Sequence, residues 1–222
     1  MSLDFGKAIS KPFSDVKTLG ISSVLNIIPL VNLLVTGYVM TMAKDTMKGK
    51  NQLREWKTDS LEEYVVNAIM AIVIQLGYFI IPLIVMGIGI VGAIGIVLAN
   101  PTNPDIAAIL AVGGLPLMVG LLLALIAAFL VPMAMMKWIK SGEVGAAFKI
   151  GDVVKNCLTG DYIVAWIFTI VFALVVGFVL GMIGLMLLFI PEIGFILYLL
   201  LNGAMSFIIT VVAYTLFAQT IK

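Results

Sequence analysis

The sequence has 222 residues, of which 62% are hydrophobic and 11% charged, with a net charge of +1 at pH 7. Soluble domains carry about 25% charged residues, so this composition excludes an ordinary soluble domain and predicts an integral membrane protein. The chain has no histidine, and Cys157 is its single cysteine. This excludes an intrachain disulfide, a thiolate metal cluster and catalysis by histidine. We therefore expect no catalytic residue, metal or cofactor, and no nucleic-acid partner.

Residues 1–18 place apolar side chains near helical spacing among lysines and aspartates, with Pro12 as a break. This pattern indicates a short amphipathic helix that lies on the membrane surface with its lysines toward the headgroups. A frayed tail at the same place is the alternative.

Residues 19–43 are apolar, but Pro29 lies near their centre between Asn26 and Asn32. Proline removes a backbone donor from a helix, and two amides at the deepest point of a single span would be costly. Both features are explained by a re-entrant hairpin that turns at Pro29, because each half-helix is too short to cross the bilayer. A single helix kinked at Pro29 is the alternative.

Four long apolar stretches predict membrane-spanning helices, since a bilayer core needs roughly 20 apolar residues per helix. They cover residues 64–99, 106–136, 162–190 and 193–218. Ser60 and Glu63 have capping-box spacing at the start of the first span. This span is longer than one crossing requires, so we expect either a kink at Pro82 or a first part that lies at the interface.

Two polar loops, residues 44–59 and 137–161, hold most of the basic residues, whereas the connections 100–105 and 191–192 contain none. The positive-inside rule therefore places both basic loops and both termini in the cytoplasm of a multi-pass cell-membrane protein. This orientation also requires residues 19–43 to turn back. Apolar residues at helical intervals predict a second surface helix in the later loop: Val144, Ala147, Phe148, Val154 and Leu158.

Together these elements predict an all-α fold. It is a polytopic transmembrane helical bundle with four long spans, an N-terminal re-entrant or kinked hairpin, and short interfacial amphipathic helices. We expect residues 1–222 to form a single integral membrane domain.

Four segments carry a family resemblance, and one of them is residues 137–153, with Gly142 and the run AAF at 146–148. Residues 11–15 read KPFSD, residues 25–32 read LNIIPLVN and lead to Gly37 and Tyr38, and residues 53–56 read LREW. These segments resemble the prokaryotic, mostly archaeal, membrane family catalogued as domain of unknown function 4013. That family has Leu-Pro-Glu-Trp at the last motif, so Arg54 stands in place of its proline. The resemblance implies a polytopic membrane protein and carries over no catalytic residue.

Gly177, Gly181 and Gly184 form a glycine face on the third span. Such faces let two helix backbones approach closely, either within the chain or in a dimer. Residues 87–92 match a dinucleotide-binding glycine pattern, but they lie inside a span and follow no strand. Helix contact is therefore the expected role of these glycines as well.

The last span carries a polar stripe that repeats every four residues, formed by Asn202, Ser206, Thr210 and Tyr214. The stripe could line a hydrated path or hold a polar solute, or its groups could hydrogen-bond to neighbouring helices. Asn67 and Gln75 share one face of the first span and are the expected partners of the stripe.

No ionisable residue lies within a predicted span, which argues against a proton-coupled pump. The sequence therefore predicts a non-enzymatic membrane protein that passes or binds a small or lipidic solute. The alternative is a scaffold or subunit that packs against other membrane proteins. Expected partners are membrane lipids and either a second copy of the chain or a different membrane protein.

Overall fold

The structure is a computed structural model that describes residues 3–221; residues 1–2 of the expected N-terminal helix, and Lys222, lie outside the described residues. Every regular element among the described residues is helical, and four of these helices are long and apolar enough to cross a membrane. This confirms the predicted all-α fold with four long spans. The chain divides into two compact units, one formed by Met1–Ile72 with Pro132–Lys222 and the other by Val73–Val131.

The first unit begins with helix α1 (Phe5–Ser10), a 3-10 turn (Lys11–Phe13) and helix α2 (Val16–Ile27). Asp4 and Asp15 cap α1 and α2, because their carboxylates accept hydrogen bonds from backbone N–H groups in the first turn of each helix. Pro12 lies in the 3-10 turn, as expected of a residue that cannot continue a helix. The segment expected as one surface helix is therefore interrupted before α2 begins.

The chain turns back between α2 and α3 (Asn32–Met47), with Pro29 inside the turn. The two helices have 12 and 16 residues, and at 1.5 Å per residue they measure about 18 Å and 24 Å. Both are shorter than a bilayer core of about 30 Å. The turn therefore has the shape expected of a re-entrant hairpin, and its position in a bilayer stays a prediction.

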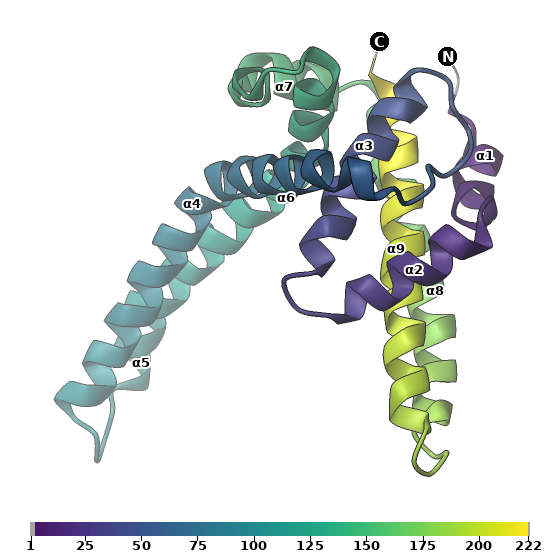
Figure 1. The fold of residues 1–222 in the computed structure, drawn as a ribbon. Helices are drawn as coiled ribbons and strands as arrows, with labels where there is room; N and C mark the ends of the chain where they lie inside the picture. Colours follow the sequence, from purple (N-terminus) through teal and green to yellow (C-terminus); the bar gives the residue numbers. More distant parts are fainter. Residues whose placement is uncertain (1–2, 222) are drawn as a thin grey trace. The chain divides into compact units, whose positions relative to one another are not determined.

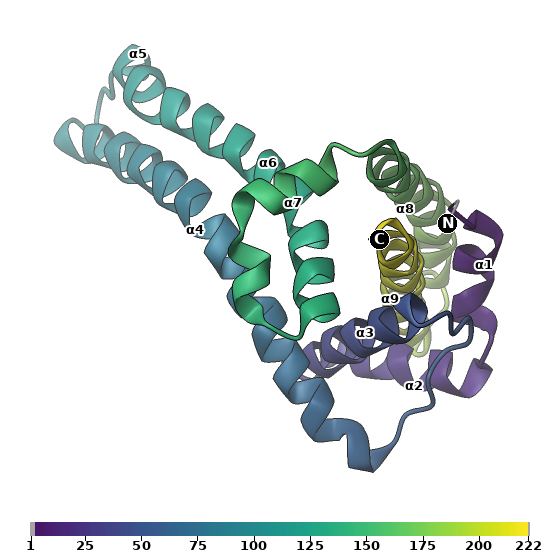
Figure 2. The same ribbon diagram turned by 90° about the horizontal axis from the view of Figure 1, so that it is seen from above.

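Helix α9 (Gly194–Thr220) is the core of the first unit. Figures 1 and 2 show it enclosed by α1, α2, α3 and α8 (Gly160–Leu187), all of which contact it. The Asp4 N–H bonds the Gln219 side chain at one end of α9, at 2.8 Å. The Asn26 amide donates to the Gly203 carbonyl nearer the middle, at 3.3 Å. The α2–α3 hairpin therefore enters beside one end of α9, reaches toward its middle and returns to the same end.

The segments that hold most of the basic residues gather at this end of α9. Lys11 contacts Thr46 at the end of α3. Tyr214 of α9 donates a hydrogen bond to Met135 near the end of α6 (Leu115–Ser141), and the ring centroids of Tyr162, at the start of α8, and Phe217 are 5.4 Å apart. The structure thus places both basic loops on one side of the unit. Their cytoplasmic orientation stays a prediction.

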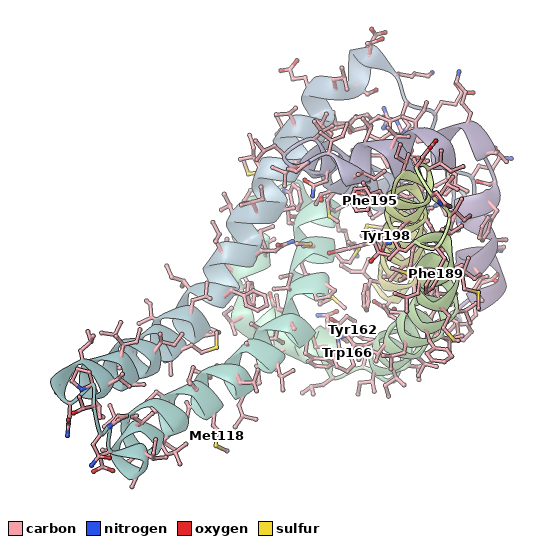
Figure 3. The ribbon with its side chains drawn as sticks, turned by 90° about the horizontal axis from the view of Figure 1, so that it is seen from below. Met118, Tyr162, Trp166, Phe189, Phe195 and Tyr198 are labelled. Carbon is pink, nitrogen blue, oxygen red and sulfur yellow. The ribbon has the colours of Figure 1, made fainter. Side chains whose placement is uncertain are left out.

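The opposite end of α9 joins α8 through a tight turn at Pro191 and Glu192, where Glu192 has a φ of 66°. Figure 3 shows Phe189, Phe195 and Tyr198 at this end of the two helices. Phe189 and Phe195 are exposed. The turn is thus bordered by large exposed apolar side chains.

The loop that follows α6 contains two short helices, a 3-10 helix (Val144–Phe148) and α7 (Ile150–Cys157). The helix expected in this loop is present in two pieces, because Lys149 has a ψ of 74° and leaves the helical conformation. Phe148 and Leu158 are consequently exposed. Of the predicted apolar residues, Ala147 is buried, and Val153 and Cys157, which the pattern did not name, are buried as well.

The second unit, Val73–Val131, contains most of α4 (Leu61–Ala99), a short α5 (Ile106–Ile109), a π-helical turn (Leu110–Gly114) and the first part of α6 (Leu115–Ser141). Helix α4 continues through Pro82. The two helical segments of this hairpin approach each other at glycines. A Cβ at Gly89 would lie 2.8 Å from the Gly113 carbonyl oxygen. The π-helical turn precedes Pro116, which has no N–H to donate to the preceding turn.

Candidate functional site

A network of hydrogen bonds fixes the loop 48–57 against the N-terminal helices. Four side chains from residues 11–38 bond to this loop, and we call them and their partners the loop anchor. The bonds are Lys11 Nζ to the Lys50 carbonyl (3.1 Å), the Leu53 N–H to Ser14 Oγ (2.9 Å), Trp56 Nε1 to Ser22 Oγ (2.9 Å), and the Tyr38 hydroxyl to the Arg54 carbonyl (2.6 Å). Loops are usually mobile, so this density of anchoring indicates a loop held in one conformation.

Aromatic rings form the apolar part of the same site. The Trp56 indole stacks on the Tyr38 ring with centroids 4.7 Å apart, and the Tyr64 ring meets the indole edge-on at 5.1 Å. Tyr38 also lies 6.1 Å from Phe207 of α9. Such pairs contribute about 0.5–1.5 kcal/mol each beyond their buried area. The rings therefore join α3, the start of α4, α9 and the loop into one cluster.

Gly37 explains how α3 comes so close to α4. A Cβ at this position would overlap the Tyr64 carbonyl oxygen. Only glycine allows this approach, because any larger side chain would separate the two backbones. Three residues of the segments that carry the family resemblance, Ser14, Tyr38 and Trp56, are thus brought together at the loop anchor.

Lys11 is the buried charge of the loop anchor, with 1% of its surface exposed. Its ammonium donates to Thr46 Oγ1 at 2.6 Å and to the Lys50 carbonyl. Within the part of the chain that the structure describes, no carboxylate lies within ion-pair distance of it. Burial therefore lowers the pKa of Lys11 to about 8, and the nearby Asp45 opposes this shift.

Arg54 connects the loop to the start of α4. Its guanidinium lies 3.3 Å from the Glu63 carboxylate and donates to Ser60 Oγ at 3.2 Å. Glu63, which we expected to complete a capping box with Ser60, thus forms an ion pair with Arg54. Arg54 occupies the position at which the family motif has proline. In this chain the residue at that position makes an ion pair with Glu63 and a hydrogen bond with Ser60.

The polar stripe of α9 is largely satisfied within its own helix. Asn202 donates to the Tyr198 carbonyl (2.8 Å), and Thr210 donates to the Ser206 carbonyl (2.7 Å). Ser206 is exposed, and the Tyr214 hydroxyl donates to Met135 Sδ at 2.9 Å.

Of the two residues expected to pair with the stripe, Asn67 has a different partner in the structure. Asn67 donates its amide to Thr41 Oγ1 of α3 at 2.9 Å, so this amide has a partner outside the stripe. Gln75 is exposed and belongs to the Val73–Val131 unit.

The glycine face of α8 divides into two parts. Gly184 lies against α9, since a Cβ there would be 3.0 Å from the Tyr198 ring. At Gly177 and Gly181 a Cβ would meet nothing within 4 Å. Packing within the chain therefore accounts for Gly184, and the first unit leaves Gly177 and Gly181 open.

The residues of the predicted re-entrant turn have different roles. Asn26 binds α9 through the Gly203 carbonyl, and a Cβ at Gly203 would overlap the Ser23 carbonyl oxygen. Pro29 is exposed within the turn, and Asn32 is exposed as the first residue of α3. Of the two asparagines, Asn26 thus holds the hairpin against the core helix.

A concave recess of about 500 Å³ lies beside the loop anchor and was not predicted as a site. Its lining residues are charged: Asp45, Lys48, Lys50, Arg54, Glu55 and Lys57. The signal present in the sequence was the basic loop itself, which predicted only orientation.

Among the described residues, no group of histidine, cysteine or carboxylate side chains could hold a metal ion. Burial raises the pKa of the Cys157 thiol to about 11, so this thiol stays protonated at neutral pH.

These features define a multi-pass helical membrane protein whose basic segments surround one end of a central helix. Residues 21–189 match the family described as "Protein of unknown function (DUF4013)". The match covers most of the chain, and the protein therefore belongs to this family. No curated protein and no solved structure matches the chain.

Proposed function

We propose that the protein is a non-catalytic membrane subunit that pairs with another membrane-embedded chain through the Gly177–Gly181 face of α8. The observation that carries this proposal is the open space at both glycines, where an added Cβ would meet nothing within 4 Å. Glycines spaced by four residues share one side of a helix and let a second helix approach closely.

The surroundings of the two glycines support the same proposal. Leu174, Phe178 and Leu185 are exposed next to them, so two residues without side chains are flanked by large apolar side chains. Lipid tails are as apolar as these side chains, so association of helices inside a membrane depends on close packing. A face that admits a helix backbone provides such packing.

Cysteine cross-linking in membranes tests this pairing, in a chain in which Cys157 is replaced. Gly177→Cys and Gly181→Cys are expected to give cross-linked products. Val179→Cys is the matched control, because Val179 is also exposed and 100° per residue places it on the opposite side of α8. Products from purified protein in liposomes identify a second copy, and products found only in native membranes identify a different protein. No product from either glycine position in both settings would refute the proposal.

Passage or binding of a small or lipidic solute is the second candidate, and the exposed Ser206 on α9 favours it. A hydroxyl exposed between Asn202 and Thr210 offers a polar contact along an apolar helix. Flux of small polar solutes into liposomes separates the two candidates. Flux that falls in Ser206→Ala and Asn202→Ala supports a solute path, whereas inert liposomes that contain cross-linked protein support the subunit.

A further inference from the structure

The charged recess beside the loop anchor has more positive than negative groups. Two of its basic side chains have carboxylate partners, since Lys50 pairs with Asp45 at 3.1 Å and Arg54 pairs with Glu63. Lys48 and Lys57 are exposed and make no ion pair among the described residues. Glu55 is the remaining carboxylate of the lining. The recess therefore keeps two lysines available for an anion.

A buried cation lies behind this recess. Lys11 donates to the carbonyl of Lys50, a lining residue, and is itself 1% exposed. A buried charge is screened much less by water and salt than a surface charge. The ammonium of Lys11 thus adds to the positive potential of the recess without being able to contact a ligand from the solvent side.

The backbone around the recess is held in place before any ligand binds. Tyr38, Ser14 and Ser22 fix the loop through the bonds of the loop anchor. Binding to a pre-formed site avoids the entropy cost of ordering a flexible loop. The recess therefore differs from a mobile basic segment, which would attract anions only diffusely.

We infer that this recess binds the phosphate group of an anionic lipid headgroup. It lies on the loop between the end of α3 and the candidate span Thr58–Ala99, and a basic loop that borders a span is expected at the headgroup region of a bilayer. Lysine and arginine close to a membrane surface attract anionic lipids by about 1 kcal/mol each. The lipid source is favoured over free phosphate because the recess belongs to a chain embedded in a bilayer.

Native mass spectrometry of the purified full chain tests the inference by measuring retained lipid and its apparent Kd. Phosphatidylglycerol is expected to bind more tightly than phosphatidylcholine. The double variant Lys48→Gln, Lys57→Gln is expected to bind phosphatidylglycerol about thirty-fold more weakly. The control is Lys149→Gln, Lys155→Gln, which removes two exposed lysines from the other basic loop and should leave the affinity close to that of the wild type.

Three results would overturn the inference. One is equal affinity for the two lipids. Another is an equal loss of affinity in both double variants, which would indicate diffuse attraction to the whole basic surface. The third is displacement of phosphatidylglycerol by inorganic phosphate at comparable concentration, which would assign the recess to a free anion.

Discussion

The contact between α2 and α9 leads to the sharpest prediction, which concerns Gly203. A Cβ at this position would overlap the Ser23 carbonyl oxygen. This oxygen belongs to a helix backbone and cannot rotate away as a side chain would. Gly203→Ala is therefore expected to push α2 away from α9 and to weaken the bond from the Asn26 amide to the Gly203 carbonyl.

The expected change in the free energy of unfolding of Gly203→Ala is the sum of three contributions. Forcing an extra carbon into a packed contact costs about 1–3 kcal/mol, and the lost hydrogen bond between helices costs about 0.6 kcal/mol. Alanine also gains up to about 1 kcal/mol over glycine in a helix. Gly87→Ala has the same gain without the clash, since Gly87 lies inside α4 and nothing lies within 4 Å of that position. Because the helix gain cancels in the comparison, the two variants should differ by about 2–4 kcal/mol.

Titration with SDS in mixed micelles, followed by circular dichroism, measures the free energy of unfolding of each variant. Gly20→Ala is a second control, because Gly20 lies in α2 itself and a Cβ there also meets nothing within 4 Å. Both control variants should match or exceed the wild type in stability. If Gly203→Ala unfolds at the same SDS fraction as the controls, the close contact of α2 with α9 is refuted.

Three further predictions concern orientation, charge and the loop. In a chain without Cys157, a cysteine at Ser10 should be protected from an impermeant external thiol reagent while one at Thr102 is labelled; the reverse result would invert the topology. Because the pKa of Lys11 is about 8 in the folded state and 10.5 without burial, the unfolded chain binds more protons between these values, and stability should rise with pH across this window. Lys11→Met should remove that rise in a pH series of SDS titrations, and an unchanged slope would contradict the buried charge. Tyr38→Phe loses one hydrogen bond to the loop and should destabilise the fold by about 1 kcal/mol with faster trypsin cleavage within residues 48–57, whereas an unchanged cleavage rate would contradict the anchoring.

The four spans were predictable because the length and apolarity of a helix that crosses a membrane are encoded locally. The first and last residues of these helices were less predictable. The last predicted span, 193–218, is observed as Gly194–Thr220, and the second predicted span, 106–136, continues as helix to Ser141. The turn at Pro29 was also predictable, because proline and the two flanking asparagines mark it within a few residues.

The glycine contacts show where local information ends. Spacing identifies which glycines share a face, but it does not say which face has a neighbour. Gly181 belongs to a G-x-x-x-G pattern and faces open space, whereas Gly113 lies near a loop in sequence and a Cβ there would be 2.8 Å from the Ala93 Cβ. A leucine is therefore expected to be more costly at Gly113 than at Gly181, the opposite of what the pattern alone indicates.

The loop anchor could not be predicted from the sequence for a related reason. Its bonds join residues such as Ser14 and Leu53, which are distant in sequence and carry no shared motif. The family resemblance marked several of these residues without saying that they meet. Only the packing of α2 and α3 against α9 brings them together, and no local pattern encodes that arrangement.

The α2–α3 hairpin has a turn that the first unit leaves uncovered. Its turn lies beyond the Asn26 contact with the middle part of α9, and Leu30 within it is 80% exposed with a φ of 69°. Backbone that leaves the helical conformation at membrane depth is tolerated only where protein covers it or where it lines a water-filled cavity. The elements of the first unit leave this leucine uncovered. If the hairpin lies in the membrane as predicted, its turn needs either cover by protein outside the first unit or a water-filled cavity beside it.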